Sequence, residues 1–222
     1  MRLTVVIPIY NESATCQTLI ERVKTNPIPR QIIVIDDGST DGSTQILRNI
    51  KEIDLIKHDI NQGKGAAVQT AIPHIRGDYV ILQDGDLEYN PSDYKKLLQP
   101  LEDGTADAVY GSRWLGKNPR WTFHYIGNRL ITFLSNLLNG ANITDMASCY
   151  KAMPSDILRS LDIRSTGFGL EAEITAKLFK RDATVVEVPI DYKRRTKQAG
   201  KKLRIKDGVI AAWSCLKYKL WG

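Results

Sequence analysis

The chain has 222 residues, of which 42% are hydrophobic and 25% are charged, and its formal net charge at pH 7 is +6. This composition fits one large domain with a sizeable core and excludes disordered and fibrous proteins. No apolar run approaches the roughly 20 residues of a membrane-spanning helix, and the first residues read as a strand rather than a signal peptide. Three widely spaced cysteines favour a reducing compartment, and three isolated histidines argue against a zinc site.

Strand and helix patterns alternate along most of the chain. Short apolar runs, typical of strands inside a covered sheet, are separated by segments with apolar residues at helical spacing. This alternation predicts an α/β fold with a mostly parallel central sheet flanked by helices. The expected strands are residues 3–9, 31–35, 53–57, 79–83, 108–110 and 184–189, with a short extended piece at 145–151. The expected helices are 12–24, about 41–51, 61–75, one starting near 91, 121–139, 170–180 and 205–220.

Carboxylates gather where the strand 79–83 ends. Asp84 and Asp86 flank a glycine, and Glu88 follows two residues later. The glycine lets the backbone bend towards a ligand, and strand geometry points the two aspartates to the same side. Carboxylate oxygens suit Mg²⁺ or Mn²⁺, and ligands bind open α/β sheets at this strand edge. We therefore predict a metal site of Asp84, Asp86 and Glu88; a solvated Asp-Gly turn is the alternative.

Further candidates for ligand binding follow other strands and helices. Asp37 ends the strand at 31–35 and either accepts hydrogen bonds from a nucleobase or ribose, or caps the next helix. Lys64 lies in a glycine-containing turn that opens a helix, which is typical of a weak anion site. Arg113 follows the strand at 108–110, and Arg129 interrupts an uncharged helical run. Arginine grips phosphate bidentately, so both are predicted phosphate ligands, with surface arginines as the alternative.

The C-terminal segment carries the basic charge. Residues 193–222 contain ten basic and one acidic residue, whereas the rest has 21 basic and 24 acidic residues. This asymmetry predicts a polyanionic partner. Nucleic acid is disfavoured because no aromatic platform accompanies the basic residues. We expect residues 193–204 to form a mobile basic loop that closes over phosphates. In residues 205–220, the apolar stripe packs either on the sheet or beside a membrane. That stripe consists of Ile205, Val209, Trp213, Leu216 and Leu220.

Four motifs in order resemble those of family 2 glycosyltransferases with the GT-A fold. They are VIPIYNE at 6–12, IDDGSTDGS at 35–43, NxGKG at 61–65 and DGD at 84–86. Later motifs at 111–113, 128–129, 145–151, 169–178 and 187–190 resemble the dolichyl-phosphate mannose synthase and polyprenyl-phosphate glycosyltransferase branch. The resemblance covers about residues 3–218. It implies a GT-A domain at 1–192, with a nucleotide-sugar half (about 1–113) and an acceptor half (about 114–192), followed by a basic loop and amphipathic helix at 193–222.

The resemblance implies an inverting, metal-dependent enzyme. It would move a hexose, glucose or mannose, from a UDP- or GDP-sugar to a polyprenyl or dolichyl phosphate, using Mg²⁺ or Mn²⁺. The implied substrate-binding residues are Pro8, Tyr10, Glu12, Ile35, Asp37, Lys64, Asp84, Gly85, Asp86, Arg113, Arg195, Lys201 and Lys202. The implied catalytic residues are Asp86, Arg113, Arg129 and Asp145. The resemblance implies that the protein is cytoplasmic and peripheral at the cytoplasmic face of a membrane. It would bind either the membrane surface or a membrane protein there.

Two alternative functions stay open. A hydroxyl of a glycan or glycolipid could be the acceptor; that reaction needs a carboxylate base, for which Asp145 is the candidate. An acceptor phosphate is already an anion and needs cationic positioning instead. The second alternative is a catalytically weak binding subunit, favoured only by Ala147, where related sequences often carry glutamate.

Overall fold

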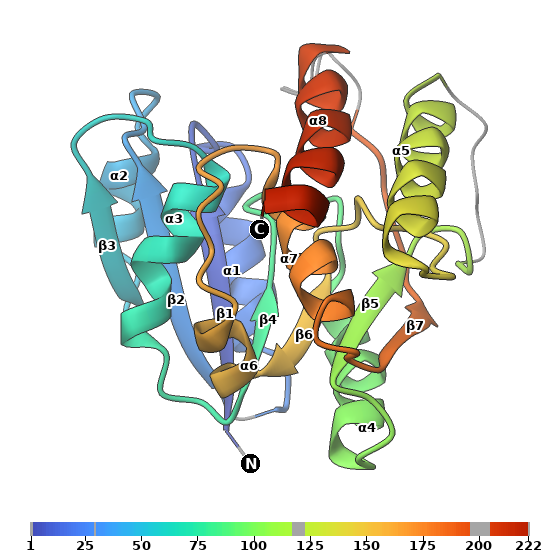
Figure 1. The fold of residues 1–222 in the computed structure, drawn as a ribbon. Coiled ribbons are helices and arrows are strands. Elements are labelled where there is room, and N and C mark those ends of the chain that lie inside the picture. The colour runs from blue at the N-terminus through green and yellow to red at the C-terminus, as the bar shows by residue number, and fades with distance from the viewer. Residues whose placement is uncertain (1, 29, 117–122, 196–204, 222) are drawn as a thin grey trace.

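A seven-stranded sheet forms the centre of the protein (Figure 1). The computed structural model describes residues 2–28, 30–116, 123–195 and 205–221. The strand order is β3-β2-β1-β4-β6-β5-β7, and β6 alone of these runs antiparallel to its neighbours. The predicted mostly parallel sheet is therefore confirmed. The strands are β1 (Leu3–Ile9), β2 (Arg30–Asp37), β3 (Asp54–His58), β4 (Tyr79–Leu82), β5 (Ala108–Ser112), β6 (Lys151–Pro154) and β7 (Val185–Pro189).

Helices flank the sheet, as the alternating pattern predicts (Figure 1). Within the described ranges, no helix combines the length and hydropathy needed to cross a bilayer. The helices are α1 (Cys16–Lys24), α2 (Ser43–Arg48), α3 (Lys64–Ala71), α4 (Tyr94–Glu102), α5 (Phe123–Asn139), α6 (Ser155–Ser160), α7 (Leu170–Phe179) and α8 (Ile205–Trp221). Two short 3₁₀ helices, η1 (Ile72–His74) and η2 (Pro91–Asp93), lie before β4 and α4.

The sheet brings three strand ends to one edge. Strands β1, β2 and β4 are parallel neighbours, and Ile9 at the end of β1 pairs with Asp36 near the end of β2. Their apolar side chains are buried in the core, so the strands cannot slip without exposing them. The polar residues that follow each strand are consequently held side by side at the carboxyl edge. This edge is where the sequence places its acids.

Two local expectations were incomplete. The extended piece expected at 145–151 contains a turn, the strand of this region, β6, begins only at Lys151, and α6 was not predicted. The apolar part of β6 is only two residues long, and its pairing depends on tertiary context. Ala152 of that strand pairs with both β4 and β5. The helix expected from residue 12 begins at Cys16 instead. Asn11 has a positive φ of 51°, and the Glu12 carbonyl accepts a hydrogen bond from the Cys16 amide at 2.8 Å, so the chain turns before the helix begins.

The apolar stripes of α5 and α8 face outwards. On α5 the exposed side chains are Ile126, Leu130, Phe133 and Leu137, at 49–71% exposure. On α8, Val209, Trp213 and Leu220 are 58–66% exposed, so the alternative that this stripe packs on the sheet is wrong for these three. The two helices contact each other, and several of their buried positions are small or polar. Those positions include Thr132 and Ser135 of α5, and Ser214 and Cys215 of α8.

We predict opposite effects of alanine at two glycines. At Gly65, an added Cβ would lie 1.9 Å from the backbone oxygen of Ser165, so Gly65→Ala should lower the free energy of unfolding by about 2 kcal/mol or more. At Gly127 inside α5, no described atom beyond the neighbouring backbone of the same helix lies within 4 Å of the added carbon. Gly127→Ala should therefore stabilise the protein by roughly 0.5–1 kcal/mol. Denaturant unfolding followed by circular dichroism compares the two, and equal shifts would contradict this packing.

Candidate active site

Lys64 links two carboxylates at the carboxyl edge of the sheet. Its Nζ lies 2.7 Å from Oδ1 of Asp84 and 2.7 Å from Oε1 of Glu171. Lys64 begins α3 and Glu171 lies in the first turn of α7, so one ammonium joins three elements. Burial works to raise the pKa of Asp84, but the ammonium outweighs it and lowers that pKa. Lys64 thus keeps Asp84 ionised in this conformation; its predicted contact with substrate stays a prediction.

Arg195 holds a second group of acids. Its Nη1 and Nη2 donate to the two Glu12 carboxylate oxygens at 2.8 and 3.0 Å, and Nη2 also donates to Oδ2 of Asp86 at 2.8 Å. Burial and the charges of Asp84 and Glu88 raise the pKa of Asp86 to about 7. The segment around Arg195 therefore returns across 109 positions of sequence to lie on the acids after β4.

Glu88 is held by the same C-terminal segment. Oε2 accepts a hydrogen bond from the Tyr192 hydroxyl at 2.5 Å, and Oε1 accepts one from the Arg195 amide at 2.6 Å. The Tyr192 ring in turn lies under the Arg113 guanidinium, 5.2 Å from its carbon. Tyr192 therefore connects Arg113, the predicted phosphate ligand, to the acid group, by which we mean Glu12, Asp84, Asp86 and Glu88. No feature of the sequence indicated this connection.

The three predicted metal ligands fit a divalent ion chemically. Among the described residues, no three Asp, Glu, His or Cys side chains already converge as ligands. Asp84 and Asp86 each face a cation of the protein, and Glu88 accepts two hydrogen bonds. The donors are nonetheless all hard oxygens, and they come from three carboxylates within five residues of the chain, whose mutual repulsion a bound cation would relieve. Their role as metal ligands stays a prediction.

Arg113 and Asp145 form a buried ion pair. Nε and Nη2 of Arg113 donate to the two Asp145 oxygens at 2.7 Å each, and the Arg113 amide donates at 3.0 Å. Their side chains are 8% and 0% exposed. Glu187 of β7 supports this pair by accepting hydrogen bonds from the Thr144 and Asp145 amides at 2.6 and 2.9 Å. The alternative of a surface arginine is therefore wrong for Arg113, whereas phosphate binding stays a prediction.

Arg129 lies beside this pair but is more loosely held. Its Nη1 donates to the Thr144 carbonyl at 3.2 Å, and its guanidinium carbon lies 4.9 Å from the centre of the Trp114 ring. The side chain is exposed. The predicted pair of arginines, Arg113 and Arg129, is thus brought to the same turn at 144–145, one buried and one accessible.

Asp37 is buried and fixes the turn before α3. Its carboxylate accepts hydrogen bonds from the Gln62 and Gly63 amides at 2.9 and 2.8 Å and from the Asn61 side chain at 2.9 Å. The His58 Nδ1 lies 2.7 Å away. These contacts support a structural role in the glycine-containing turn, beyond the helix cap considered from sequence. Its contact with a nucleotide stays a prediction.

The remaining predicted substrate-binding residues are differently placed. Tyr10 is 38% exposed and Pro8 half-buried, both at the end of β1, and Gly85 packs closely on the Pro8 carbonyl. Ile35 is wholly buried in the core, and its contact with substrate stays a prediction. Lys201 and Lys202 lie outside the described residues, as does the predicted basic loop beyond residue 195.

Sequence reasoning gave no individual role to Glu171, Glu187 or Tyr192, although the first two lie within the motifs at 169–178 and 187–190. Glu187 carried a usable signal, because an acid stands inside the otherwise apolar strand VVEVP. Glu171 carried a weaker one, as an acid in the first turn of a helix, which is common for structural reasons. Tyr192 carried none, since its partners lie 79 and 104 positions away along the chain.

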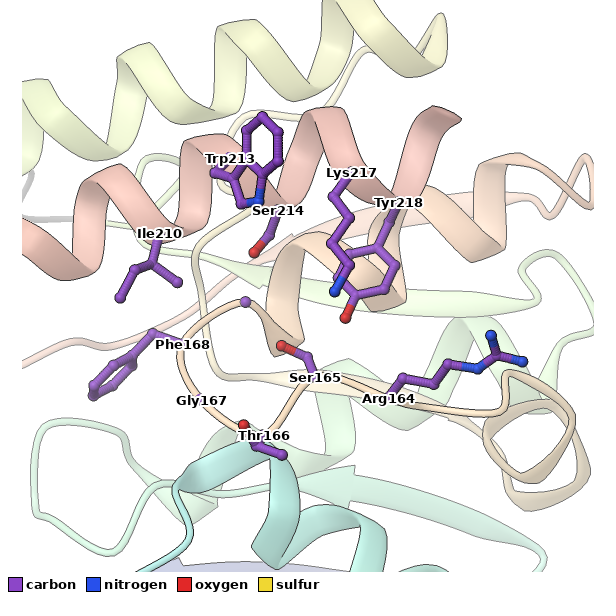
Figure 2. Close-up of a pocket in the computed structure, with 11 residues that line it drawn as sticks. Arg164, Ser165, Thr166, Gly167, Phe168, Ile210, Trp213, Ser214, Lys217 and Tyr218 are labelled. Carbon is purple, nitrogen blue, oxygen red and sulfur yellow. The ribbon is translucent and has the colours of Figure 1, made fainter. Parts of the chain in front are cut away.

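A surface cavity of about 360 Å³ opens between α8 and the loop 164–169 that precedes α7 (Figure 2). Phe168, Ile210 and Trp213 supply apolar surface at one side. Arg164 and Lys217 supply cationic groups at the other. The cavity is therefore amphiphilic, and the exposed stripe of α8 continues from it.

We predict that Arg113 contributes to folding as well as to the site. Arg113→Ala should cost about 3–5 kcal/mol of stability, because it leaves Asp145 charged and buried without its partner. Arg129→Ala, the matched control, should cost about 1 kcal/mol or less because that side chain is exposed. Denaturant unfolding of both variants, with Arg113→Met/Asp145→Leu to remove the whole pair, tests this. A cost for Arg113→Ala no larger than for Arg129→Ala would show that the pair does not stabilise the fold.

The sequence is similar to known glycosyltransferases. Residues 4–162 match the family model described as Glycosyl transferase family 2. The chain is 31% identical over 210 residues to the glycosyltransferase AglJ of Haloferax volcanii, covering 93% of this chain and 68% of AglJ. It is 28% identical over 212 residues to the undecaprenyl-phosphate mannosyltransferase of Micrococcus luteus, covering 88% of this chain and 85% of that enzyme.

The fold is similar to that of a solved glycosyltransferase. Glucosyl-3-phosphoglycerate synthase from Mycobacterium tuberculosis, in complex with Mn²⁺, UDP and phosphoglyceric acid, matches with a TM-score of 0.77 at 19% identity. The match covers 99% of this chain and 77% of that one. The predicted GT-A fold is confirmed. On the family match and the 31% identity, the chain belongs to glycosyltransferase family 2.

Proposed function

We propose that this glycosyltransferase moves a hexose, with inversion, from a UDP- or GDP-sugar to a polyprenyl or dolichyl phosphate. Similarity to the undecaprenyl-phosphate mannosyltransferase of Micrococcus luteus supports a lipid phosphate acceptor. The observation that carries the proposal is the engagement of Asp145, the candidate base, by three donors of Arg113. With both its oxygens engaged, Asp145 is poorly placed to take a proton from a hydroxyl. An acceptor that is already an anion needs no such base.

The chemistry then depends on positioning and charge. An oxygen of the acceptor phosphate attacks the anomeric carbon of the hexose while the bond from that carbon to the nucleoside diphosphate breaks on the opposite face. Arg113 and Arg129 would orient the acceptor phosphate, because guanidinium groups match phosphate oxygens. Arg195 would contact the phosphates from the other side of the acid group. Two like-charged phosphates approach each other only where such cations offset their repulsion.

Asp84, Asp86 and Glu88 would hold a divalent ion, Mg²⁺ or Mn²⁺. When bound, that ion supplies charge neutralisation of the leaving diphosphate. The similar glucosyl-3-phosphoglycerate synthase was solved with Mn²⁺ and UDP, which supports the same donor half, about residues 1–113, for this chain. Glu12 and Asp37 lie at the ends of the neighbouring strands and would hold the nucleotide.

The outward stripes of α5 and α8 would lie on a membrane surface. Isolated exposed apolar residues are ordinary, but two contacting helices that both expose an apolar stripe are a candidate interaction surface. A lipid phosphate presents its headgroup at such a surface, and the amphiphilic cavity beside Trp213 would accommodate an amphiphile there. We therefore propose a peripheral enzyme at the cytoplasmic face, where nucleotide sugars and the lipid acceptor meet.

We predict transfer to a short prenyl phosphate and none to the prenol of the same chain length. The two acceptors differ only in the phosphate, so product formation with purified protein, Mn²⁺ and UDP- or GDP-hexose separates the acceptor classes. Transfer to the prenol, or to a glycan hydroxyl, would favour the hydroxyl alternative. No transfer to any acceptor with any donor tested would favour a binding subunit.

We predict that Asp86→Asn loses metal-dependent affinity for the nucleoside diphosphate. The amide keeps the size of the side chain but removes the charge that attracts the ion. Calorimetry with UDP and GDP, in Mn²⁺ and in EDTA, measures the difference. Asp107→Asn, at the opposite end of the sheet before β5, is the matched control and should bind like the natural protein. A nucleotide affinity that changes neither with EDTA nor in Asp86→Asn would contradict the metal assignment.

We predict that Phe133→Glu and Trp213→Glu each weaken binding to anionic vesicles by tenfold or more. Withdrawing one large apolar side chain from the interface loses about 1.5–3 kcal/mol. Gln45→Glu on α2 adds the same charge at an exposed polar position and is the matched control. Vesicle co-sedimentation measures the binding, and an equal loss for Gln45→Glu would show that charge alone, rather than the apolar face, decides it.

A further inference from the structure

We propose that residues 192–195 form a latch that keeps the acid group from taking a divalent ion until a nucleoside diphosphate arrives. Arg195 here bridges Glu12 and Asp86, of which Asp86 is a predicted metal ligand, and it leaves these acids when metal and nucleotide bind together. This inference rests on the proposed function and assigns Arg195 two alternative partners. It concerns the described residues of the segment alone.

The latch occupies the oxygens that an ion would need. Arg195 lies 2.8 Å from Oδ2 of Asp86 and binds both oxygens of Glu12. The Arg195 amide and the Tyr192 hydroxyl take the two oxygens of Glu88. The Lys193 amide also donates to the Glu88 carbonyl at 2.8 Å. Two of the three predicted metal ligands, Asp86 and Glu88, are thus engaged by three of the four residues at 192–195.

A metal ion and the closed latch exclude each other. Both positive groups would need Oδ2 of Asp86, and a divalent ion next to the guanidinium would suffer like-charge repulsion in a partly buried site. Metal binding therefore requires Arg195 to move. The third predicted ligand, Asp84, is held by Lys64 on the other side, so the latch controls the part of the acid group that faces the C-terminal segment.

The latch is also built to open. Nε of Arg195 is buried and has no hydrogen-bond partner among the described residues, so the guanidinium is incompletely satisfied where it lies. A buried donor without a partner costs free energy, and this cost weakens the contacts of Arg195 with Glu12 and Asp86. A diphosphate offers the same guanidinium a bidentate anionic partner. Nucleotide binding therefore offers Arg195 the diphosphate as a new partner and releases Asp86 and Glu88 in the same step.

The consequence is an order of binding. A metal ion alone must open the latch without compensation, and its apparent affinity falls by the fraction of molecules that are open. If the latch is closed in about ten molecules for each open one, apparent metal affinity is about tenfold weaker than that of an open site. Metal with nucleoside diphosphate avoids this loss because Arg195 exchanges one anion for another.

The test is Mn²⁺ binding to the full chain, measured by electron paramagnetic resonance of free Mn²⁺. Without nucleotide, Arg195→Gln should bind Mn²⁺ about tenfold more tightly than the natural protein. Lys193→Gln removes a neighbouring exposed charge and should leave the affinity unchanged. With UDP or GDP present, the advantage of Arg195→Gln should disappear, because that variant also lacks the arginine that binds the diphosphate.

A second variant opens the latch from the other side. Glu12→Gln removes the bidentate partner and should also tighten Mn²⁺ binding, and the Glu12→Gln/Arg195→Gln double variant should gain no more than Arg195→Gln alone. Equal or weaker Mn²⁺ binding by Arg195→Gln overturns the latch. The proposed function is tested separately, by transfer of sugar to prenyl phosphate in the natural protein. A gain of the same size in Lys193→Gln reduces the effect to general charge and also overturns it.

Discussion

The structure depends on the compensation of carboxylates at the carboxyl edge of the sheet. Parallel strands bring Glu12, Asp84 and Asp86 together, and like charges at such spacing would repel each other strongly if left alone. The protein answers with its own cations, Lys64 from α3 and Arg195 from beyond β7. These ion pairs fasten both halves of the chain to one edge. A site that must be held by internal cations is also one that an external cation could enter.

The sheet and the two helices α5 and α8 have different roles. The sheet fixes the polar edge, whereas the two helices contact each other and present apolar side chains outwards. An apolar surface beside a cationic site suits an amphiphilic acceptor better than a free sugar or a protein side chain. The geometry of the edge and the chemistry of the outer face therefore support the same acceptor class.

Much of the fold could be predicted, because it follows from the spacing of apolar residues and from the order of strands and helices along the chain. The apolar strands and the helices between them specify a parallel sheet, and a parallel sheet puts Asp37 and the acids after β4 on one edge. Contacts between distant segments could not be predicted. Lys64 meets Glu171 across 107 positions and Tyr192 meets Glu88 across 104, which no local pattern encodes. An amphipathic stripe in a sequence also does not reveal whether its apolar side chains pack inside the protein or stay exposed. Phe133 and Trp213 lie on such stripes and are exposed.

The central claim is that the acids after β4 exchange a protein cation for a metal ion when nucleotide binds. A structure of the protein with Mn²⁺ and UDP or GDP tests it most directly. The account predicts Mn²⁺ coordinated by carboxylate oxygens among Asp84, Asp86 and Glu88, with the Arg195 guanidinium released from Glu12 and in contact with the diphosphate. Mn²⁺ bound elsewhere, or Arg195 still paired with Glu12 and Asp86 beside a bound nucleotide, would contradict it.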